Sequence, residues 1–149
     1  MASRRQLREQ ALQLLFELDM NTGPAVNALE RFWSARKPGT NDRQFVDKLV
    51  LGVREKLAEI DAVVTGYAKN WDIKRMAVVD RNVLRMAIFE MLHCKDVPAV
   101  VVINEAVDIA KYFSSAESGR FVNGILDRFR KDMEHDATPA AKSKPVADK

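Results

Sequence analysis

The sequence predicts an all-α protein with six or seven helices. Apolar residues recur at helical spacing along most of the chain, and no segment is typical of a strand. Helix breakers are few, with six Gly and five Pro among 149 residues. The composition, 47% hydrophobic and 30% charged, is that of an ordinary globular protein. The length favours one domain. We expect it over residues 1–134, because the polar, Ala-, Lys- and Pro-rich segment 135–149 has the composition of a disordered tail.

The first three predicted helices cover residues 3–20, 25–36 and 42–69. Each places apolar residues three or four positions apart, as on the buried face of an amphipathic helix. The segment Asn21-Thr22-Gly23-Pro24 separates the first two, because Gly favours the end of a helix and Pro the first turn of the next. The third helix is long, and we expect Gly52 or the charged run 54–56 to divide it in two.

The last three predicted helices cover residues 75–93, 99–113 and 117–133. The first of these is apolar nearly all round, which predicts a central helix covered on most sides. The β-branched run 100–103 could form a strand, but the residues after it keep the helical period, so we favour a helix. Ser114 and Glu117 have the spacing of a capping box for the last helix.

The last predicted helix contains Asn123-Gly124, a dipeptide that usually favours a hairpin turn. The apolar residues around it keep helical spacing, so we expect it inside the helix. A Gly in the middle of a helix costs about 1 kcal/mol relative to Ala. We therefore predict that another segment packs closely against Gly124 and that the Asn123 side chain forms a hydrogen bond with a neighbouring segment. Both residues either serve packing alone or form a contact point within a helical assembly.

The predicted central helix carries charges close to a core, where charges need partners. We expect Arg85 to pair with Glu105 of the next helix. Asp80 and Arg81 lie near the start of the central helix. They are either ordinary solvated charges or part of a surface for another protein.

No pattern typical of catalysis or metal binding is present. His93 and His135 are the only histidines, and neither has a partner at metal-ligand spacing. The chain has no Gly-rich phosphate loop, nucleophile elbow or Walker lysine. Glu105 and Asp108 lie one turn apart, but no such loop accompanies them. We therefore expect no enzyme activity, no metal and no cofactor.

The single cysteine, Cys94, has no partner for an internal disulfide, and we expect it in the core. This cysteine usage is typical of a reducing, cytoplasmic location. No apolar stretch is long enough to span a bilayer, and the N-terminus lacks the apolar segment of a secretory signal. We expect no membrane association.

A basic flank of the first predicted helix is the strongest indication of function. At about 100° per residue, Arg5, Arg8, Leu12 and Phe16 share a stripe away from the core face, with Arg4 beside it. Arginine binds phosphates, and an exposed ring stacks on an unpaired base. The net charge of +3 permits an anionic partner. The flank therefore predicts an RNA-binding surface, although a solvated helix start with the ring packed against a neighbouring helix explains the same pattern.

Four stretches of the chain resemble the NusB family of bacterial transcription antitermination factors. They are RRQLREQALQLLF, VDRNVLRMAIFEML, VPAVVVINEAVDIAKYF and GRFVNGILD. The resemblance covers most of residues 3–133 and implies an all-helical fold of two small bundles packed together. It also implies a non-enzymatic protein that pairs with the ribosomal protein NusE and binds single-stranded boxA RNA. With the transcription elongation complex, such a protein helps RNA polymerase read through terminators, notably in ribosomal RNA operons.

The same resemblance implies roles for individual residues. The RNA-binding positions match Arg4, Arg5, Arg8, Phe16, Glu117, Arg120 and Phe121. The NusE-facing position matches Asp80, with Arg81 beside it.

Other functions remain open on the sequence alone. Some RNA methyltransferases carry a domain of this type, but the chain has no room for a methyl-donor domain. A helical scaffold that binds proteins or associates with itself, without direct RNA contact, is the alternative to an RNA-binding factor. A homodimer could hide the basic N-terminal stripe, although nothing in the residues requires one.

Overall fold

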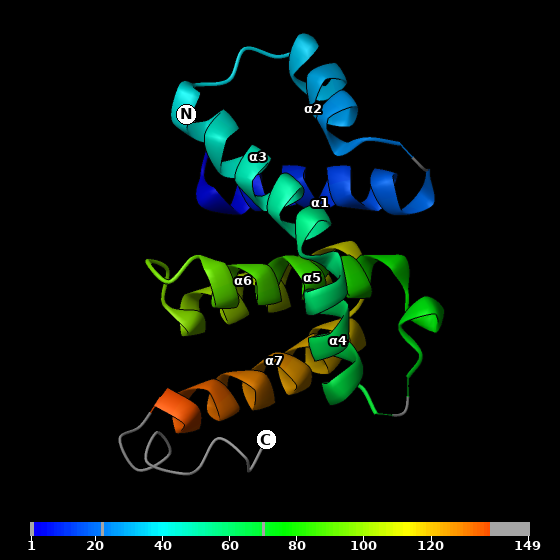
Figure 1. Cartoon of the computed structure of the whole chain (residues 1–149), viewed down its shortest axis with the longest axis vertical. Coiled ribbons are helices and arrows are strands. Elements are labelled where there is room, and N and C mark those ends of the chain that lie inside the picture. Colours follow the sequence, from blue (N-terminus) through cyan, green and yellow to red (C-terminus); the bar gives the residue numbers. More distant parts are fainter. Residues whose placement is uncertain (1, 22, 70, 138–149) are drawn as a thin grey trace.

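The computed structural model describes residues 2–21, 23–69 and 71–137, which form seven α-helices and one short 3₁₀-helix, η1 (Figure 1). The α-helices are α1 (Arg4–Met20), α2 (Ala25–Ser34), α3 (Thr40–Glu55), α4 (Leu57–Tyr67), α5 (Val78–His93), α6 (Ala99–Phe113) and α7 (Ala116–Ala137), and η1 covers Ile73–Arg75. No strand occurs in these described ranges. The predicted all-α class and the predicted number of helices are confirmed.

The helices form two bundles, α1–α3 and α4–α7, stacked on one another (Figure 1). Helix α5 packs against α1 and α3 of the other bundle and against α4, α6 and α7 of its own. Eleven of its sixteen residues are buried, so the prediction of a central helix is confirmed. One hydrophobic core runs through both bundles, and Cys94 is buried in it, as predicted. Within the described part of the chain, no helix has the length and apolar character needed to cross a membrane.

The helix boundaries follow local capping chemistry. At the start of α1, the Ser3 hydroxyl accepts a hydrogen bond from the Gln6 backbone N–H at 3.1 Å, and the Gln6 side chain accepts one from the Ser3 backbone N–H at 2.9 Å. This reciprocal capping box satisfies two backbone donors that the helix itself leaves free. The long predicted third helix divides at Lys56, inside the charged run 54–56.

The junction between α6 and α7 differs from the prediction. Ser115 caps α7, because its hydroxyl accepts a hydrogen bond from the Ser118 backbone N–H at 3.1 Å. The predicted capping box of Ser114 and Glu117 is wrong, because the backbone N–H of Ser114 instead closes the last turn of α6. The serine next in the chain takes the capping role.

Helix α7 is longer than predicted. It continues to Ala137, so residues 135–137 are helical rather than part of the predicted tail. The rest of that predicted segment, 138–149, lies outside the described residues.

Close packing against a helical glycine occurs at Gly52, not at Gly124. A Cβ atom on Gly52 would overlap the Phe89 ring, so the absent side chain lets α3 cross α5 at short range. A Cβ atom on Gly124 would meet nothing within 4 Å apart from its own helix, and Asn123 is also exposed. The predicted close approach at Asn123 and Gly124 is therefore wrong.

Ion pairs join the two bundles along the length of α1. Near its start, Arg8 is 3% exposed and donates through Nε and Nη2 to both carboxylate oxygens of Glu90, at 2.9 and 2.8 Å. Near its end, Asp19 accepts hydrogen bonds at 2.6–3.3 Å from three side chains of α5: Arg81, Asn82 and Arg85. These contacts attach α1 to the central helix at both ends.

The predicted pair of Arg85 and Glu105 is wrong. Arg85 donates to both carboxylate oxygens of Asp61 in α4, at 2.8 and 3.0 Å, as well as to Asp19. Glu105 accepts two hydrogen bonds from Arg5 of α1, both at 2.7 Å. Both charges have partners, but these come from helices far away along the chain rather than from each other.

Asp19 is the acidic centre of one inter-bundle contact. Burial opposes its ionisation, but hydrogen bonds from Arg81 and Asn82, with the charges of Arg85 and Arg81, outweigh this and hold the pKa of Asp19 below its usual value. A lowered native pKa means that ionised Asp19 stabilises the fold above its unfolded-state pKa of about 3.9. That contribution is lost as the pH falls through the native pKa.

Substitutions at the two glycines should have opposite effects on stability. Gly52→Ala forces a methyl group against the buried Phe89 ring, and overpacking a core costs about 1–3 kcal/mol. Gly124→Ala adds helix propensity at an open site and should raise the free energy of unfolding by about 0.5–1 kcal/mol. Urea denaturation measures both changes, and a stabilised Gly52→Ala protein would contradict the close crossing of α3 and α5.

Arg8 and Glu90 should be strongly coupled in stability. Arg8→Met leaves the buried Glu90 unpaired, and Glu90→Leu leaves Arg8 with only its 4.0 Å contact to Glu105. Each single variant should lower the free energy of unfolding by about 3–5 kcal/mol. The double variant replaces the pair by apolar side chains, and its free energy of unfolding should fall by much less than the sum of the two single-variant losses. Urea denaturation of the four proteins measures the coupling. Additive losses would show that the two side chains act independently.

Candidate nucleic-acid and partner surfaces

Two of the predicted RNA-binding arginines lie at the surface at the start of α1. Arg4 is exposed, and its guanidinium carbon lies 4.1 Å from the centroid of the Phe45 ring, which is a cation–π contact. Arg5 is partly exposed and donates to Glu105 at 2.7 Å and to Asp108 at 3.0 Å. Arg4 keeps its full charge, whereas two carboxylates neutralise that of Arg5.

Arg8 and Leu12 are buried, so the predicted exposure of the stripe is wrong at these two positions. Arg8 is 3% exposed and Leu12 is 4% exposed. The stripe faces the second bundle, and Glu90 of α5 receives the Arg8 guanidinium. Arg8 reaches an external phosphate only by breaking its buried ion pair.

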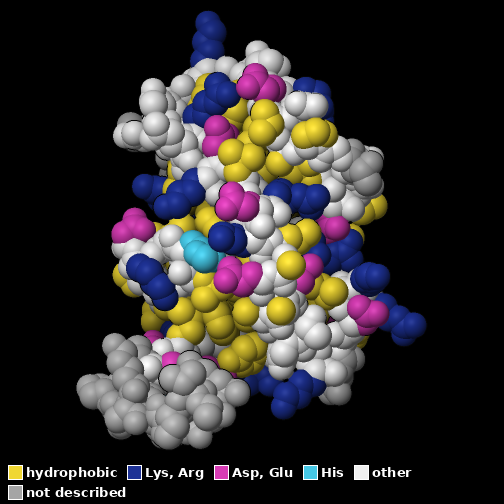
Figure 2. All heavy atoms as spheres, in the orientation of Figure 1, with side chains coloured by type: hydrophobic (Ala, Val, Ile, Leu, Met, Phe, Trp, Pro, Cys, Tyr) yellow, Lys and Arg dark blue, Asp and Glu magenta, His cyan; other side chains and the backbone are white. Residues whose placement is uncertain are grey.

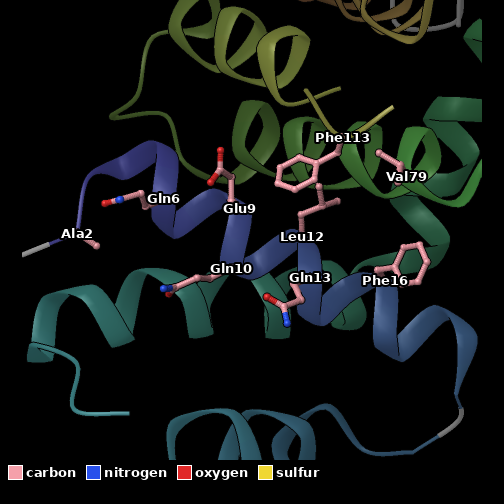
Figure 3. Close-up of a pocket in the computed structure, with 9 residues that line it drawn as sticks. All are labelled: Ala2, Gln6, Glu9, Gln10, Leu12, Gln13, Phe16, Val79 and Phe113. Carbon is pink, nitrogen blue, oxygen red and sulfur yellow. The ribbon is translucent and has the colours of Figure 1, made fainter. Parts of the chain in front are cut away.

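Phe16 lies on the rim of a groove between the two bundles (Figure 3). The groove has a volume of about 600 Å³. Phe16 is 39% exposed, and Phe113 at the end of α6 is 45% exposed. Figure 3 shows Gln10 and Gln13 projecting from α1 on the side of α2 and α3, whereas Phe113 approaches from the second bundle. The groove thus combines two exposed rings with amide groups of α1.

Phe113 is a site residue that the sequence did not reveal. It stands four residues after Ile109 and seven after Ala106, which are both buried. By helical period it therefore resembles a core residue. It is exposed because α6 ends there, at the edge of the bundle, and the sequence pattern does not show where that edge lies.

Predicted residues of α5 and α7 meet in a second hollow, of about 370 Å³, which we call the Asp80 hollow. Asp80, Glu117 and Phe121 line it together with Trp71, whose ring meets that of Phe121 edge to face with centroids 6.1 Å apart. Trp71 is 55% exposed and was not predicted as a site residue. Arg120, next to Phe121, is exposed, and no acidic partner is found for it in the described ranges.

Asp80 is a buried carboxylate with one oxygen left unpaired. It is 9% exposed; one oxygen accepts a hydrogen bond from the Ser118 hydroxyl at 3.2 Å, and the other has no partner among the described residues. Burial raises the pKa of Asp80. Arg81 turns instead toward α1 and pairs with Asp19 at 2.6 Å. Asp80 and Arg81 are therefore not ordinary solvated charges, which was the first of the two alternatives that the sequence left open.

The groove and the Asp80 hollow are neighbours. Val79 lines the groove and Asp80 lines the hollow; likewise, Phe113 lines the groove and Ser115 lines the hollow. Both sites thus depend on the start of α5 and on the junction of α6 and α7. Phe16, Asp80, Glu117 and Phe121 therefore line neighbouring hollows, whereas the predicted residues Arg4, Arg5, Arg8 and Arg120 line neither of them.

The electrostatics of these sites are local. Basic and acidic side chains are interspersed over the face shown in Figure 2, with no large area of one sign. No cluster of three or more His, Cys, Asp or Glu side chains that could hold a metal occurs in the part of the chain that the structure describes.

Comparisons with known proteins agree on one family. The model of the NusB family matches residues 5–131. A relative from Pelotomaculum thermopropionicum, named transcription antitermination protein NusB, is 44% identical over 135 residues, which are 89% of this chain and 92% of the relative.

Solved structures agree with this assignment. The structure of T. maritima NusB has a TM-score of 0.80 and 35% identity, and the match covers 88% of this chain and 92% of that one. A chain of the crystal structure of antitermination factors NusB and NusE in complex with dsRNA has a TM-score of 0.77 and 25% identity, covering 87% and 96%. Sequence and fold therefore lead to the same conclusion: this chain belongs to the NusB family.

Proposed function

We propose that this protein is a non-enzymatic, RNA-binding transcription antitermination factor. It pairs with the ribosomal protein NusE and binds boxA RNA in the cytoplasm. With the transcription elongation complex, it promotes read-through by RNA polymerase, notably in ribosomal RNA operons. The groove between Phe16 and Phe113 carries this proposal, because it offers exposed rings to bases on a chain whose relatives are named for transcription antitermination.

The groove suits an unpaired RNA strand. A base that stacks on an aromatic ring gains about 1–3 kcal/mol, and Phe16 and Phe113 both expose such a ring. The amides of Gln6 and Gln13 in the same groove can both donate and accept hydrogen bonds at base edges. A duplex keeps its base faces inside the helix, so the groove favours unpaired boxA RNA.

The three arginines of α1 have different roles in this proposal. Arg4 is exposed and has no ion pair among the described residues, so it is available to a phosphate. Arg5 must leave Glu105 and Asp108 before it can bind one. Arg8 is a positioning residue: its buried pair with Glu90 fixes which face of α1 carries Phe16 outward.

The Asp80 hollow is the proposed NusE surface. A buried carboxylate oxygen without a partner costs free energy, and a donor side chain from a partner protein would satisfy it. Glu117 adds a second carboxylate, and Trp71 adds an exposed ring of the kind enriched at interfaces. A basic side chain of NusE fits this chemistry.

One observation favours the alternative of a helical scaffold without RNA contact. Arg5 and Arg8, which form much of the basic flank in the sequence, are both neutralised by carboxylates of the same chain. Val100 and Val101 on α6 are 52% and 44% exposed and offer an apolar contact to a protein or a second copy. RNA binding that is absent or independent of salt would favour the scaffold.

Phe16→Ala should lower the affinity for single-stranded boxA RNA by about 1–3 kcal/mol, or about 5- to 150-fold, because one stacking platform is removed. Stability should change little, since the ring is outside the core. Fluorescence anisotropy with boxA RNA, and with its duplex as a second probe, measures the effect. Leu51→Ala, at a position 37% exposed on α3, is the matched control. An unchanged affinity with a lower melting temperature would assign Phe16 to packing instead.

Asp80→Lys should abolish the binding of NusE, because it reverses the charge of the hollow. Asp80→Asn keeps the shape and should weaken binding by about 2–5 kcal/mol. Asp96→Lys, at an exposed position outside the hollow, should have no effect. Co-elution on gel filtration, with circular dichroism to verify helical content, measures all three. If both Asp80 variants still co-elute with NusE, the hollow is not the interface.

A further inference from the structure

Three basic side chains lie beside the groove, at the end of α2 and in the segment that follows it. We call Arg31, Arg36 and Lys37 the basic border. Arg31 and Arg36 line a hollow of about 350 Å³ that also includes Gln13 and Phe16 of the groove. Arg36 and Lys37 line another hollow, of about 400 Å³, which also borders α1. The border therefore continues the groove across α1 onto α2.

The basic border is not neutralised by carboxylates. In the part of the chain that the structure describes, Arg31 and Lys37 are exposed and have no ion pair, and the one side-chain hydrogen bond of Arg36 is to a backbone oxygen. Two acidic residues line the same hollows. Glu17 is exposed beside Arg31, and Asp42 already accepts a hydrogen bond from the Ala2 backbone N–H at 3.2 Å. The border keeps a net positive charge, whereas Arg5 and Arg8 do not.

Arg36 is already held in position for an anion. Its guanidinium carbon lies 3.7 Å from the centroid of the Phe32 ring, and Nη1 donates to the Phe32 carbonyl oxygen at 2.7 Å. The remaining guanidinium donors face no acidic partner among the described residues and match the fork geometry of a phosphate. Little side-chain entropy is lost on binding, because the stack already restricts the rotamers.

The end of α2 is itself fixed to the first bundle. Phe32 and Trp33 are buried, and the Trp33 indole N–H donates to Asp47 of α3 at 2.7 Å. Arg31 thus sits on a helix that is fixed to the first bundle, and Arg36, in the segment after that helix, is held by its contacts with Phe32. A rigid base-stacking ring beside rigid cations is the arrangement that binds a single strand along its length.

We propose that the basic border binds the phosphodiester backbone of the RNA strand whose unpaired base stacks on Phe16. This inference rests on the proposed function and extends it, because it adds a phosphate contact across α1, on α2 and the segment that follows it. Charge complementarity selects the occupant: the groove offers rings for bases, and the border offers cations for the phosphates joined to them. An acidic segment of a protein is the competing occupant, and the experiment separates the two.

The test compares the salt dependence of RNA binding in variants of equal net charge. The border variant carries Arg31→Gln, Arg36→Gln and Lys37→Gln. The control variant carries Lys56→Gln, Lys69→Gln and Lys95→Gln, three exposed positions that line neither the groove nor the border hollows. The probe is single-stranded boxA RNA, with affinity measured from about 50 to 200 mM salt.

The border variant should bind RNA at least about tenfold more weakly at low salt. Its plot of log K against log salt should flatten by about 0.7 for each phosphate that the protein no longer neutralises, hence by about 2 for three phosphates. The control variant should keep the wild-type slope. Arg31→Gln with Lys37→Gln, which leaves the stack of Arg36 on Phe32 intact, should flatten the slope by about 1.4 and guards against a folding artefact.

Three results would overturn the proposal, and they are distinguishable. If the wild-type protein binds no RNA, or Phe16→Ala changes nothing, the proposed function itself fails and this inference fails with it. If Phe16→Ala weakens binding but border and control variants behave alike, only the inference fails. If the border variant loses NusE and keeps RNA, the border binds a protein.

Discussion

The buried ion pair of Arg8 and Glu90 sets the position of α1, on which much else depends. Two charges that are 3% and 1% exposed have to meet with good geometry, because each alone in the core would be very costly. The pair therefore fixes both the height and the rotation of α1 on α5. The rotation turns Phe16, Gln6 and Gln13 toward solvent and Leu12 toward the core. Arg8, which the sequence predicts as an RNA-binding residue, thus has a structural role: its ion pair positions the Phe16 side chain at the surface.

The proposed RNA and partner sites are products of how the bundles meet. The groove takes its rings from α1 and α6, and the Asp80 hollow takes its groups from α5, α7 and the segment around Trp71. No single helix contains a complete site. Val79 and Asp80 are adjacent in α5 and line different hollows, so the two sites share one turn of the central helix. This arrangement suits a protein whose relatives include one solved with both NusE and RNA.

Much of the fold could be predicted from sequence, because local periodicity and capping determine it. The helices, the division near Lys56 and the central place of α5 all follow from patterns within one segment. The partners of Arg8 and Arg85 could not be predicted, since they depend on which helices pack together. Gly124 illustrates the same limit: a helical glycine indicates close packing, but here the contact belongs to Gly52. Phe113 has the spacing of a core residue and is exposed only because its helix ends at an edge. The proposed site was recognised mainly through the family resemblance, and its geometry required the three-dimensional structure.

The contact of Gly52 with Phe89 has a consequence for the mouth of the groove. One wall of the groove belongs to α1 in the first bundle, and the other belongs to α5 and α6 in the second. The gap between these walls depends on how closely the bundles pack, and the absence of a side chain at Gly52 allows α3 to approach the Phe89 ring of α5. One added side-chain carbon at position 52 would push α3 away from α5. The groove would then widen between residues that this carbon does not contact.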